Sequence, residues 1–295
     1  MNATPEFTED VEALSQWLEG RARVFVLTGA GCSTSSGIPD YRDLDGSWKR
    51  KPPVTYQAFI GEAATRQRYW ARSFVGWPMF SEARPNAAHH ALAGWQRAGG
   101  VSMLLTQNVD GLHQKAGSID VIDLHGRLDE VRCLQCDYRE ARASVQATMA
   151  AANPGWTTHV AMAAPDGDAD LEHADIASFR IPDCPVCGGL LKPDVVFFGE
   201  NVPLPRVQAA QRALERSDGM LVVGSSLMVY SGYRFARMAN AAGIEIAIAT
   251  RGATRADDLA SLKCHADCTA LVPAVLGARA GGHRAADPGA ATSLA

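Results

Sequence analysis

The stretch VFVLTGAGCSTSSGIPDYR, residues 24–42, decides the fold. Its first four residues are apolar and indicate a short buried strand. Gly29, Ala30 and Gly31 follow, and residues this small let the backbone turn sharply and approach a ligand closely. Doubly wound α/β proteins use such a strand and glycine turn to present backbone N–H groups to a dinucleotide pyrophosphate. The next glycine is Gly37, so the usual G-x-G-x-x-G spacing is not kept, and an ordinary tight turn is the alternative.

Along the rest of the chain, the spacing of apolar residues predicts alternating strands and helices. Short apolar runs between turn residues predict strands, and i, i+3, i+4 spacing predicts helices. Strands are expected at 101–106, 121–124, 220–223 and 244–249, and helices at 8–19, over most of 55–79, after Asn86, at 206–216 and at 231–241. The repeated βαβ order indicates helices on both faces of a parallel sheet. The expected fold class is therefore α/β, with a doubly wound, Rossmann-like parallel sheet.

Composition and charge narrow the classes of partner. The 295 residues carry a formal net charge of -4, which gives no bulk attraction to phosphate backbones, so nucleic acid is not an expected direct partner. No apolar run approaches the ~18–20 residues of a membrane span. The acidic amino end has neither a signal-peptide core nor an Arg-rich transit pattern. We therefore expect a cytoplasmic protein with no membrane partner, and the sequence leaves the oligomeric state open, with a monomer as one option.

Four of the seven cysteines form two C-x-x-C pairs, Cys133 with Cys136 and Cys184 with Cys187. In a reducing compartment such pairs favour a metal over disulfides. Two pairs can supply a tetrahedron of thiolates, which suits one structural zinc ion with no open position. The stretch between the pairs is long for a zinc ribbon and includes APDGDADLEH at 164–173, which we expect to be a surface insertion. Unmetallated thiols or a redox pair are the alternative.

Several longer strings resemble the sirtuins, the family of NAD-dependent protein deacylases. They are GAGCSTSSGIPDYR at 29–42, TQNVDGLH at 106–113, LHG at 124–126, LKPDVVFFGE at 191–200 and GSSL at 224–227. Together they extend the resemblance over roughly residues 24–275. RQRYWARSFVGWP, GSSLMVYSGYRF and RADDLASLK are most similar to the class II branch, which has bacterial and mitochondrial-type members.

The resemblance implies that NAD binds across the strand ends, with its pyrophosphate on the turn at 29–33. The loop at 40–42 would close over the nicotinamide ribose and gate the reaction, and a solvated surface loop is the alternative. Asn108 and Asp110 would hold the nicotinamide ribose and carboxamide. Thr250 stands where many sirtuins place an Asn against the adenosine ribose, and its shorter reach weakens that expected contact. The implied cofactor-binding residues are Gly29, Ala30, Gly31, Ser33, Ile38, Asp40, Tyr41, Arg42, Gln107, Asn108, Val109, Asp110, Gly224, Ser225, Ser226, Thr250, Arg251, Gly252 and Cys268.

The resemblance also implies that acyl-lysine proteins or peptides are the substrates. Their backbone would pair with the extended segment at 195–200, which would wall an acyl-lysine tunnel. Tyr69 and Arg72 match a Y-x-x-R arrangement that sirtuins use against acidic acyl groups, and an Arg fork with a Tyr hydroxyl suits a carboxylate. A helix with Tyr69 packed and Arg72 solvated is the alternative. The implied substrate residues are Tyr69, Arg72, Val195, Phe197, Phe198, Gly199 and Glu200.

His125 follows a predicted strand in the string L-H-G. An imidazole with an ordinary pKa near 6.5 accepts a proton at neutral pH without special tuning. The resemblance implies that His125 acts as the base for a ribose hydroxyl after nicotinamide has left, with Asn108 and Asp110 completing the catalytic set. Free lysine, nicotinamide and O-acyl-ADP-ribose would be the products. Protein mono-ADP-ribosylation on the same scaffold, or a non-catalytic module that binds NAD or acyl-lysine, are the alternatives.

The expected domain organisation is discontinuous. Residues 1–44, 76–130 and 190–276 would form the large NAD-binding domain, residues 45–75 the helical part of a smaller domain, and residues 131–189 its zinc-binding module. Residues 277–295 are rich in Ala and Gly and have little to bury, so we expect a disordered tail there.

Overall fold

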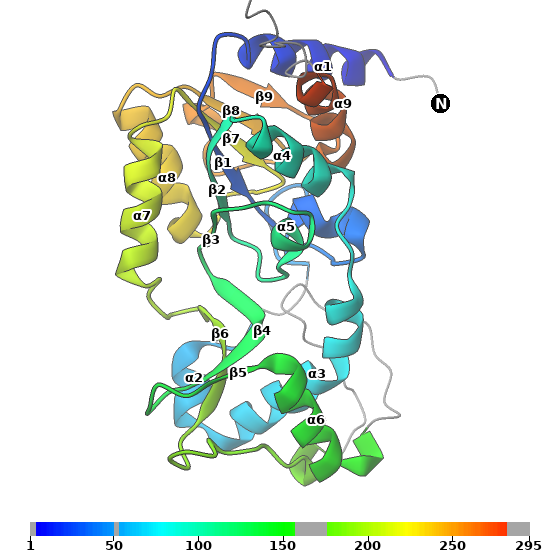
Figure 1. The fold of residues 1–295 in the computed structure, drawn as a ribbon, viewed down its shortest axis with the longest axis vertical. Helices are drawn as coiled ribbons and strands as arrows, with labels where there is room; N and C mark the ends of the chain where they lie inside the picture. Colours follow the sequence, from blue (N-terminus) through cyan, green and yellow to red (C-terminus); the bar gives the residue numbers. More distant parts are fainter. Residues whose placement is uncertain (1–3, 50–52, 157–175, 282–295) are drawn as a thin grey trace, which may run out of the picture.

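Six parallel strands form the larger of two sheets in the computed structural model, which describes residues 4–49, 53–156 and 176–281 (Figure 1). Neighbouring strands follow the order β3-β2-β1-β7-β8-β9, and every pair is parallel. The strands are β1 Val24–Thr28, β2 Val101–Thr106, β3 Val121–Asp123, β7 Gly219–Val223, β8 Ile246–Ala249 and β9 Leu262–Cys264. The predicted doubly wound parallel sheet is confirmed.

The strand order reverses at β1. The chain builds outward through β2 and β3 on one side of β1, and through β7, β8 and β9 on the other. Thr28 at the end of β1 pairs with Thr106 of β2 and with Val223 of β7, so these three strands end at one edge of the sheet. Open α/β sheets bind ligands outside the carboxyl ends of their strands at such a reversal. The topology therefore places a binding site at the turns that follow β1, β2 and β7.

Helices cover both faces of this sheet (Figure 1). One face packs against α1 Pro5–Trp17, α4 Ala87–Arg97 and α9 Cys268–Gly281, and the other against α7 Leu204–Leu214 and α8 Tyr230–Ala241. Val24 and Val26 of β1 belong to the first core, whereas Phe25 and Leu27 belong to the second. All four are fully buried. A strand buried on both faces gives a continuous apolar run, which is why VFVL signals a strand without alternation.

The smaller sheet is antiparallel, in the order β5-β4-β6, and lies at the lower end of the molecule in Figure 1. Its strands are β4 Gly126–Cys133, β5 Arg139–Ala141 and β6 Leu191–Val195, and the accompanying helices are α2 Tyr56–Gly61, α3 Ala63–Glu82 and α6 Arg142–Ala152. The remaining short elements are η1 Ala30–Ser36, α5 Leu112–Lys115, η2 Pro154–Trp156, η3 Ile176–Ser178 and η4 Asp257–Leu259. A separate core that includes Trp70, Phe74 and Phe179 holds this lobe together.

Several expected domain boundaries differ from the strands and helices. Residues 126–130 and 191–195, expected in the large domain, lie in β4 and β6 of the smaller sheet, which pair at Gly126 with Val195 and again over Val131–Cys133. α3 continues to Glu82, past the expected boundary at residue 75. The expected tail begins inside α9, which ends at Gly281.

Some further predictions concern described residues, and others concern residues that the structure does not describe. β2 has the predicted bounds, and the helix predicted after Asn86 is α4, which the Asn86 side chain caps by accepting from the Ala88 N–H at 3.0 Å. The insertion at 164–173 and residues 282–295 of the expected tail lie outside the described residues. Within the described part of the chain, no helix combines the length and the apolar character that a membrane crossing requires.

Candidate active site

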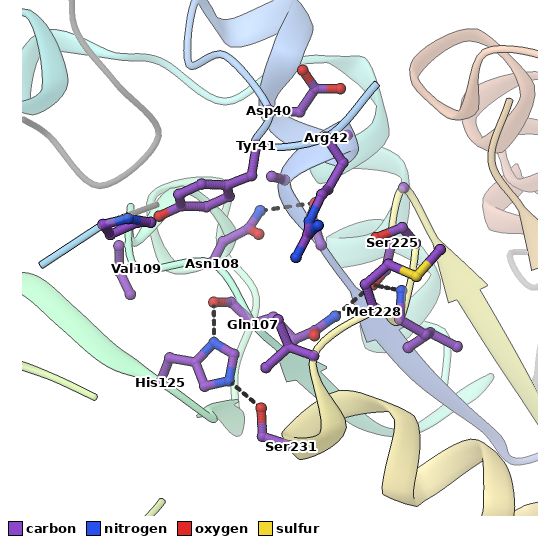
Figure 2. Close-up of a pocket in the computed structure, with 18 of the residues that line it drawn as sticks. Asp40, Tyr41, Arg42, Gln107, Asn108, Val109, His125, Ser225, Met228 and Ser231 are labelled. Carbon is purple, nitrogen blue, oxygen red and sulfur yellow. Dashed lines mark hydrogen bonds between the residues drawn. The ribbon is translucent and has the colours of Figure 1, made fainter. Parts of the chain in front are cut away.

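A cavity of about 750 Å³ lies at the carboxyl ends of the central strands. Its walls include Gly29 and Gly224 from the large sheet, and Leu128 and Val195 from the smaller one. All the implied cofactor-binding residues line this cavity, and so does His125. The structure thus brings these residues, which are distant in sequence, into one site, part of which Figure 2 shows.

The turns after β1 and β7 pack backbone against backbone. The Gly31 N–H donates to the Gly224 carbonyl oxygen at 2.8 Å. A Cβ on Gly31 would lie 2.9 Å from that same oxygen, and a Cβ on Gly29 would lie 2.7 Å from the Ser225 Cβ. The close approach therefore requires glycine in the first turn. The glycine that meets this turn is Gly224, which directly follows β7.

Ser33 joins the turn after β1 to the loop after β2. Its hydroxyl donates to Asp110 Oδ2 at 2.7 Å and accepts from Asn108 Nδ2 at 3.0 Å. Asn108 Nδ2 also donates to the Gly29 carbonyl oxygen at 3.1 Å. Asp110 Oδ1 accepts from the Leu112 N–H at 2.9 Å. Burial raises the pKa of the Asp110 carboxyl, while these two hydrogen bonds oppose that effect.

The loop at 40–49 covers one side of the cavity with aromatic and cationic side chains. Tyr41 and Arg42 both line the cavity (Figure 2). The Arg42 guanidinium lies 3.6 Å from the centre of the Trp48 ring. Trp48 also makes an edge contact with Phe198, with ring centres 5.6 Å apart. Through Trp48 this loop contacts Phe198 of the expected substrate segment, while Leu44 is exposed.

His125 is held at both ring nitrogens (Figure 2). Nδ1 lies 2.9 Å from the Gln107 carbonyl oxygen, and Nε2 lies 2.7 Å from the Ser231 hydroxyl oxygen. A carbonyl oxygen can only accept, so the proton of a neutral ring is on Nδ1. The lone pair of Nε2 then accepts from the Ser231 hydroxyl.

The expectation of an ordinary pKa for His125 is wrong. Burial lowers its pKa to about 4, and the positive charge of Arg206 acts in the same direction, while the bond to the Gln107 carbonyl opposes them. Desolvation disfavours the charged imidazolium more than the neutral ring. His125 is therefore neutral at physiological pH, in the form that can accept a proton.

The segment at 195–200 lies beside His125, and it turns at its end, where the Glu200 N–H donates to the Phe197 carbonyl oxygen at 3.0 Å and Gly199 has a φ of 79°. Phe198 forms a parallel bridge with Thr55, and the Val196 N–H donates to the His125 carbonyl oxygen at 2.7 Å. Glu200 Oε2 accepts from the Phe197 N–H at 2.9 Å and from Lys192 Nζ at 3.1 Å. The Lys192 side chain is fully buried, and desolvation lowers its pKa although Glu200 opposes this.

The two residues of the Y-x-x-R arrangement have different environments. Tyr69 lines the cavity and is buried, with its ring centre 5.1 Å from that of Phe197. Arg72 is half-buried on α3 and is not among the described residues that line the cavity. Residues three apart on a helix lie on the same face, so Arg72 is one turn along α3 from Tyr69. The role of Arg72 against an acyl carboxylate stays a prediction. The other implied substrate residues, Val195, Phe197, Phe198, Gly199 and Glu200, all line the cavity.

The turn that follows β8 also lines the cavity, through Thr250, Arg251 and Gly252. Arg251 forms an ion pair with Asp267, which also lines the cavity. Cys268, the first residue of α9, lies with its sulfur 3.5 Å from the Gly31 carbonyl oxygen. The positive charge of Arg251, next to Thr250, is thus paired with the Asp267 carboxylate.

The four cysteines of the C-x-x-C pairs come together in the smaller lobe, with their sulfurs within 4.8 Å of one another. Cys133 and Cys187 sulfurs are 3.6 Å apart, and those of Cys136 and Cys184 are 3.7 Å apart. Tetrahedral zinc with bonds of about 2.3 Å requires sulfurs about 3.8 Å apart, so the four thiols fit one structural zinc ion. The Gln135 N–H also donates to the Cys133 sulfur, at 3.3 Å. The predicted zinc site is confirmed.

Among the cavity residues that sequence reasoning missed are Ser231, which contacts His125, and Met228. Ser231 was expected only as the first residue of a helix, and nothing in its local pattern indicates a partner more than a hundred residues away. The sequence also did not reveal a buried group of Cys32, His89 and His113, whose ligand atoms lie within 4.8 Å of one another.

Comparison with known proteins gives consistent results. A model of the Sir2 family matches residues 29–231. The chain is 60% identical over 267 residues to an NAD-dependent protein deacetylase of Bordetella bronchiseptica, covering 90% of this chain and 97% of that protein. It is 46% identical over 272 residues to the NAD-dependent protein deacylase Sirt4 of Drosophila melanogaster, covering 91% of this chain and 87% of that protein.

Solved structures extend the similarity to the fold. A Sir2 complex with a p53 peptide and NAD+ is similar with a TM-score of 0.72 and 29% identity, over 91% of this chain and 98% of that one. A Sir2Tm structure bound to a propionylated peptide is similar with a TM-score of 0.70 and 29% identity, over 91% of this chain and 98% of that one.

Proposed function

The chain belongs to the Sir2 family, and from that premise we propose how its cavity performs the reaction of an NAD-dependent protein lysine deacylase. The proposed reaction removes an acyl group from a lysine side chain and releases nicotinamide and O-acyl-ADP-ribose. One observation carries the proposal. The His125 imidazole lines the cavity, is held at both ring nitrogens, and has a pKa that burial lowers to about 4, which keeps the ring neutral at physiological pH.

The cofactor side of the cavity suits a dinucleotide. The contact of Gly31 with Gly224 leaves backbone rather than side chains at the ends of β1 and β7, where a pyrophosphate can approach closely. Asn108 and Asp110 are positioned by Ser33, so we assign them to hold the nicotinamide ribose and carboxamide. When bound, NAD supplies the ADP-ribose group and nicotinamide as the leaving group.

His125 is proposed as the base for a ribose hydroxyl. The tautomer fixed by the Gln107 carbonyl leaves Nε2 as the nitrogen that takes the proton. Because the ring is desolvated, its lone pair needs no prior deprotonation at neutral pH. The resulting positive charge would form beside Arg206, which makes the imidazolium a strong acid that returns its proton readily.

The substrate side is proposed to be the segment at 195–200 together with Tyr69. Its aromatic side chains, Phe197 and Phe198, offer apolar walls to an acyl-lysine stem, and the backbone before the turn at Gly199 is proposed to offer main-chain pairing. Such pairing reads an extended peptide with little sequence preference. The net charge of -4 also favours proteins over nucleic acid as partners.

The experiment is a mass-spectrometric screen of the purified protein with NAD and a panel of acetyl-, propionyl-, succinyl- and malonyl-lysine peptides. We expect free lysine together with the matching O-acyl-ADP-ribose. His125→Ala should abolish both products, whereas His90→Ala, which removes an exposed imidazole, should leave them unchanged. Transfer of ADP-ribose to protein without O-acyl-ADP-ribose would overturn the proposal, as would full deacylation by the His125→Ala variant.

A further inference from the structure

Ser231 lies in the first turn of α8 and reaches across to the ring of His125 (Figure 2). The approach depends on its neighbour Gly232, at which a Cβ would lie 2.3 Å from Gln107 Oε1. Gln107 in turn presents its carbonyl oxygen to the other nitrogen of the same ring. The start of α8, the loop after β2 and His125 therefore form one packed unit, in which each nitrogen of the ring has a separate partner.

The two contacts have different chemical consequences. The Gln107 carbonyl accepts the Nδ1 proton and keeps it there. The Ser231 hydroxyl, at 2.7 Å, covers the Nε2 lone pair, which is the pair that a base must use. An imidazole nitrogen has a single lone pair, so a second hydroxyl can donate to Nε2 only after Ser231 has turned its own proton away. The base is thus occupied in the resting protein.

We propose that Ser231 is a positioning residue for His125, which donates to Nε2 at rest and turns to accept from Nε2–H once the ring has taken the ribose proton. The inference rests on the proposed function. In this step the bond between the ribose oxygen and its proton breaks, a bond between Nε2 and that proton forms, and the Ser231 proton stays on Ser231. A hydroxyl can play both parts because it is a donor and an acceptor on a rotatable bond.

The hydrogen bond that Ser231 accepts from Nε2–H of the protonated ring is stronger than the one it donates to the neutral ring. A hydrogen bond from a charged imidazolium is roughly twice as strong as one between neutral groups. Arg206 is the charged group that acts on the His125 ring, and it is repulsive toward the imidazolium. Ser231 therefore stabilises the charged ring against an unfavourable neighbour.

Ser231→Thr and Ser231→Val test this role as a matched pair. The two side chains have nearly the same shape, and only Thr keeps the hydroxyl. We expect kcat of the Val variant to be on the order of tenfold below that of the Thr variant, the usual scale for one hydrogen bond. The KM for NAD and the melting temperature should be the same in both. Ser144→Ala, an exposed serine on α6, is the control for an unrelated loss of a hydroxyl.

Nitrogen-15 NMR of the His125 ring gives a readout that does not depend on turnover. The Nε2 resonance should move when the hydroxyl is lost in the Val variant and stay near its wild-type position in the Thr variant. Equal kcat values in the Thr and Val variants would overturn the proposal. An Nε2 resonance that is the same in both would also do so. If His125→Ala remains active, the proposed function fails instead, and the NMR comparison still decides whether Ser231 holds the ring.

Discussion

The Ser33 hydroxyl and the Asp110 carboxylate are joined by a buried hydrogen bond of 2.7 Å across the ends of β1 and β2. Asn108 donates to the same hydroxyl, so Ser33 is the point at which the glycine turn and the polar loop are fixed relative to each other. The loop that is expected to hold the nicotinamide half of NAD is thus built on the turn that is expected to hold the pyrophosphate.

Asp110→Asn should disrupt this junction. Asp110 accepts from both the Ser33 hydroxyl and the Leu112 N–H, with one oxygen each, whereas Asn has only one acceptor oxygen. We expect the NAD dissociation constant to rise by at least about tenfold and the free energy of unfolding to fall by about 1–2 kcal/mol. Titration calorimetry and urea unfolding measure the two effects. Asp258→Asn, at an exposed position, should change neither, and NAD affinity within twofold of wild type in Asp110→Asn would contradict the argument.

Gly31→Ala should separate the two turns that form the cofactor side of the cavity. The added Cβ would lie 2.9 Å from the Gly224 carbonyl oxygen, and both partners are backbone, so neither can move aside alone. We expect NAD affinity to fall by more than about tenfold, since the dinucleotide would lose its close backbone approach. Gly61→Ala is the control, because nothing lies within 4 Å of a Cβ there. Equal NAD affinity in the two variants would show that the turn tolerates the displacement.

Local sequence patterns predict those parts of the site that are encoded by residues close together in the chain. The buried strand at 24–28 and the paired cysteines are of this kind, because apolar runs and ligand spacing reflect neighbours in the chain. The identities of the cavity residues came from the resemblance to sirtuins rather than from composition or periodicity.

The features that were not predicted depend on contacts between distant segments. Ser231 reaches His125 only because α8 packs beside the loop after β2. The low pKa of His125 follows from burial that no local pattern reveals. Arg72 matches a motif by spacing, and its role against an acyl carboxylate stays a prediction.

The pH dependence of kcat/KM should reflect a neutral His125. The base is active when unprotonated, and its pKa is about 4, below the ordinary value of 6.5. Activity attributable to this group should therefore be fully present down to about pH 5.5 and be lost as the pH falls through about 4. Kinetics between about pH 4 and pH 8 measure this, and an acid limb centred near 6.5 in a folded protein would contradict it.

Acid should destabilise the fold through His89 and His113. Burial lowers the pKa of His89 to about 4 and that of His113 well below 6.5. Below pH 6.5 the unfolded chain binds protons that the native protein does not, so the free energy of unfolding should fall as the pH drops from 6.5 toward 4. Each histidine contributes a slope of up to about 1.4 kcal/mol per pH unit. Urea unfolding at pH 7.5, 6 and 5 measures the slope, and constant stability over that range would contradict it.

Loss of one cysteine from the zinc site should release the metal and destabilise the smaller lobe. We expect about one zinc ion per purified chain, and Cys136→Ser should retain well under half of it, with a melting temperature roughly 10 °C or more lower, since structural zinc contributes several kcal/mol. Cys264→Ala is the control, because that cysteine is buried beside α1 and lies outside the group of four. Metal analysis should include iron, which four thiolates also bind. Wild-type protein without either metal would contradict the assignment.

Arg72 and Tyr69 should have separable effects on acyl-group selection. Tyr69 is buried in the cavity wall against Phe59 and Phe197, whereas Arg72 does not line the cavity within the described residues. Arg72→Leu should therefore change kcat/KM for succinyl-lysine and acetyl-lysine peptides by the same factor. Tyr69→Leu, which removes part of the wall itself, should change the ratio between acyl groups by about fivefold or more, because filling of an apolar pocket discriminates chains of different length. Kinetics with both peptides measure the two ratios. A selective loss of succinyl-lysine activity in Arg72→Leu would show instead that this guanidinium reaches the acyl carboxylate when substrate is bound.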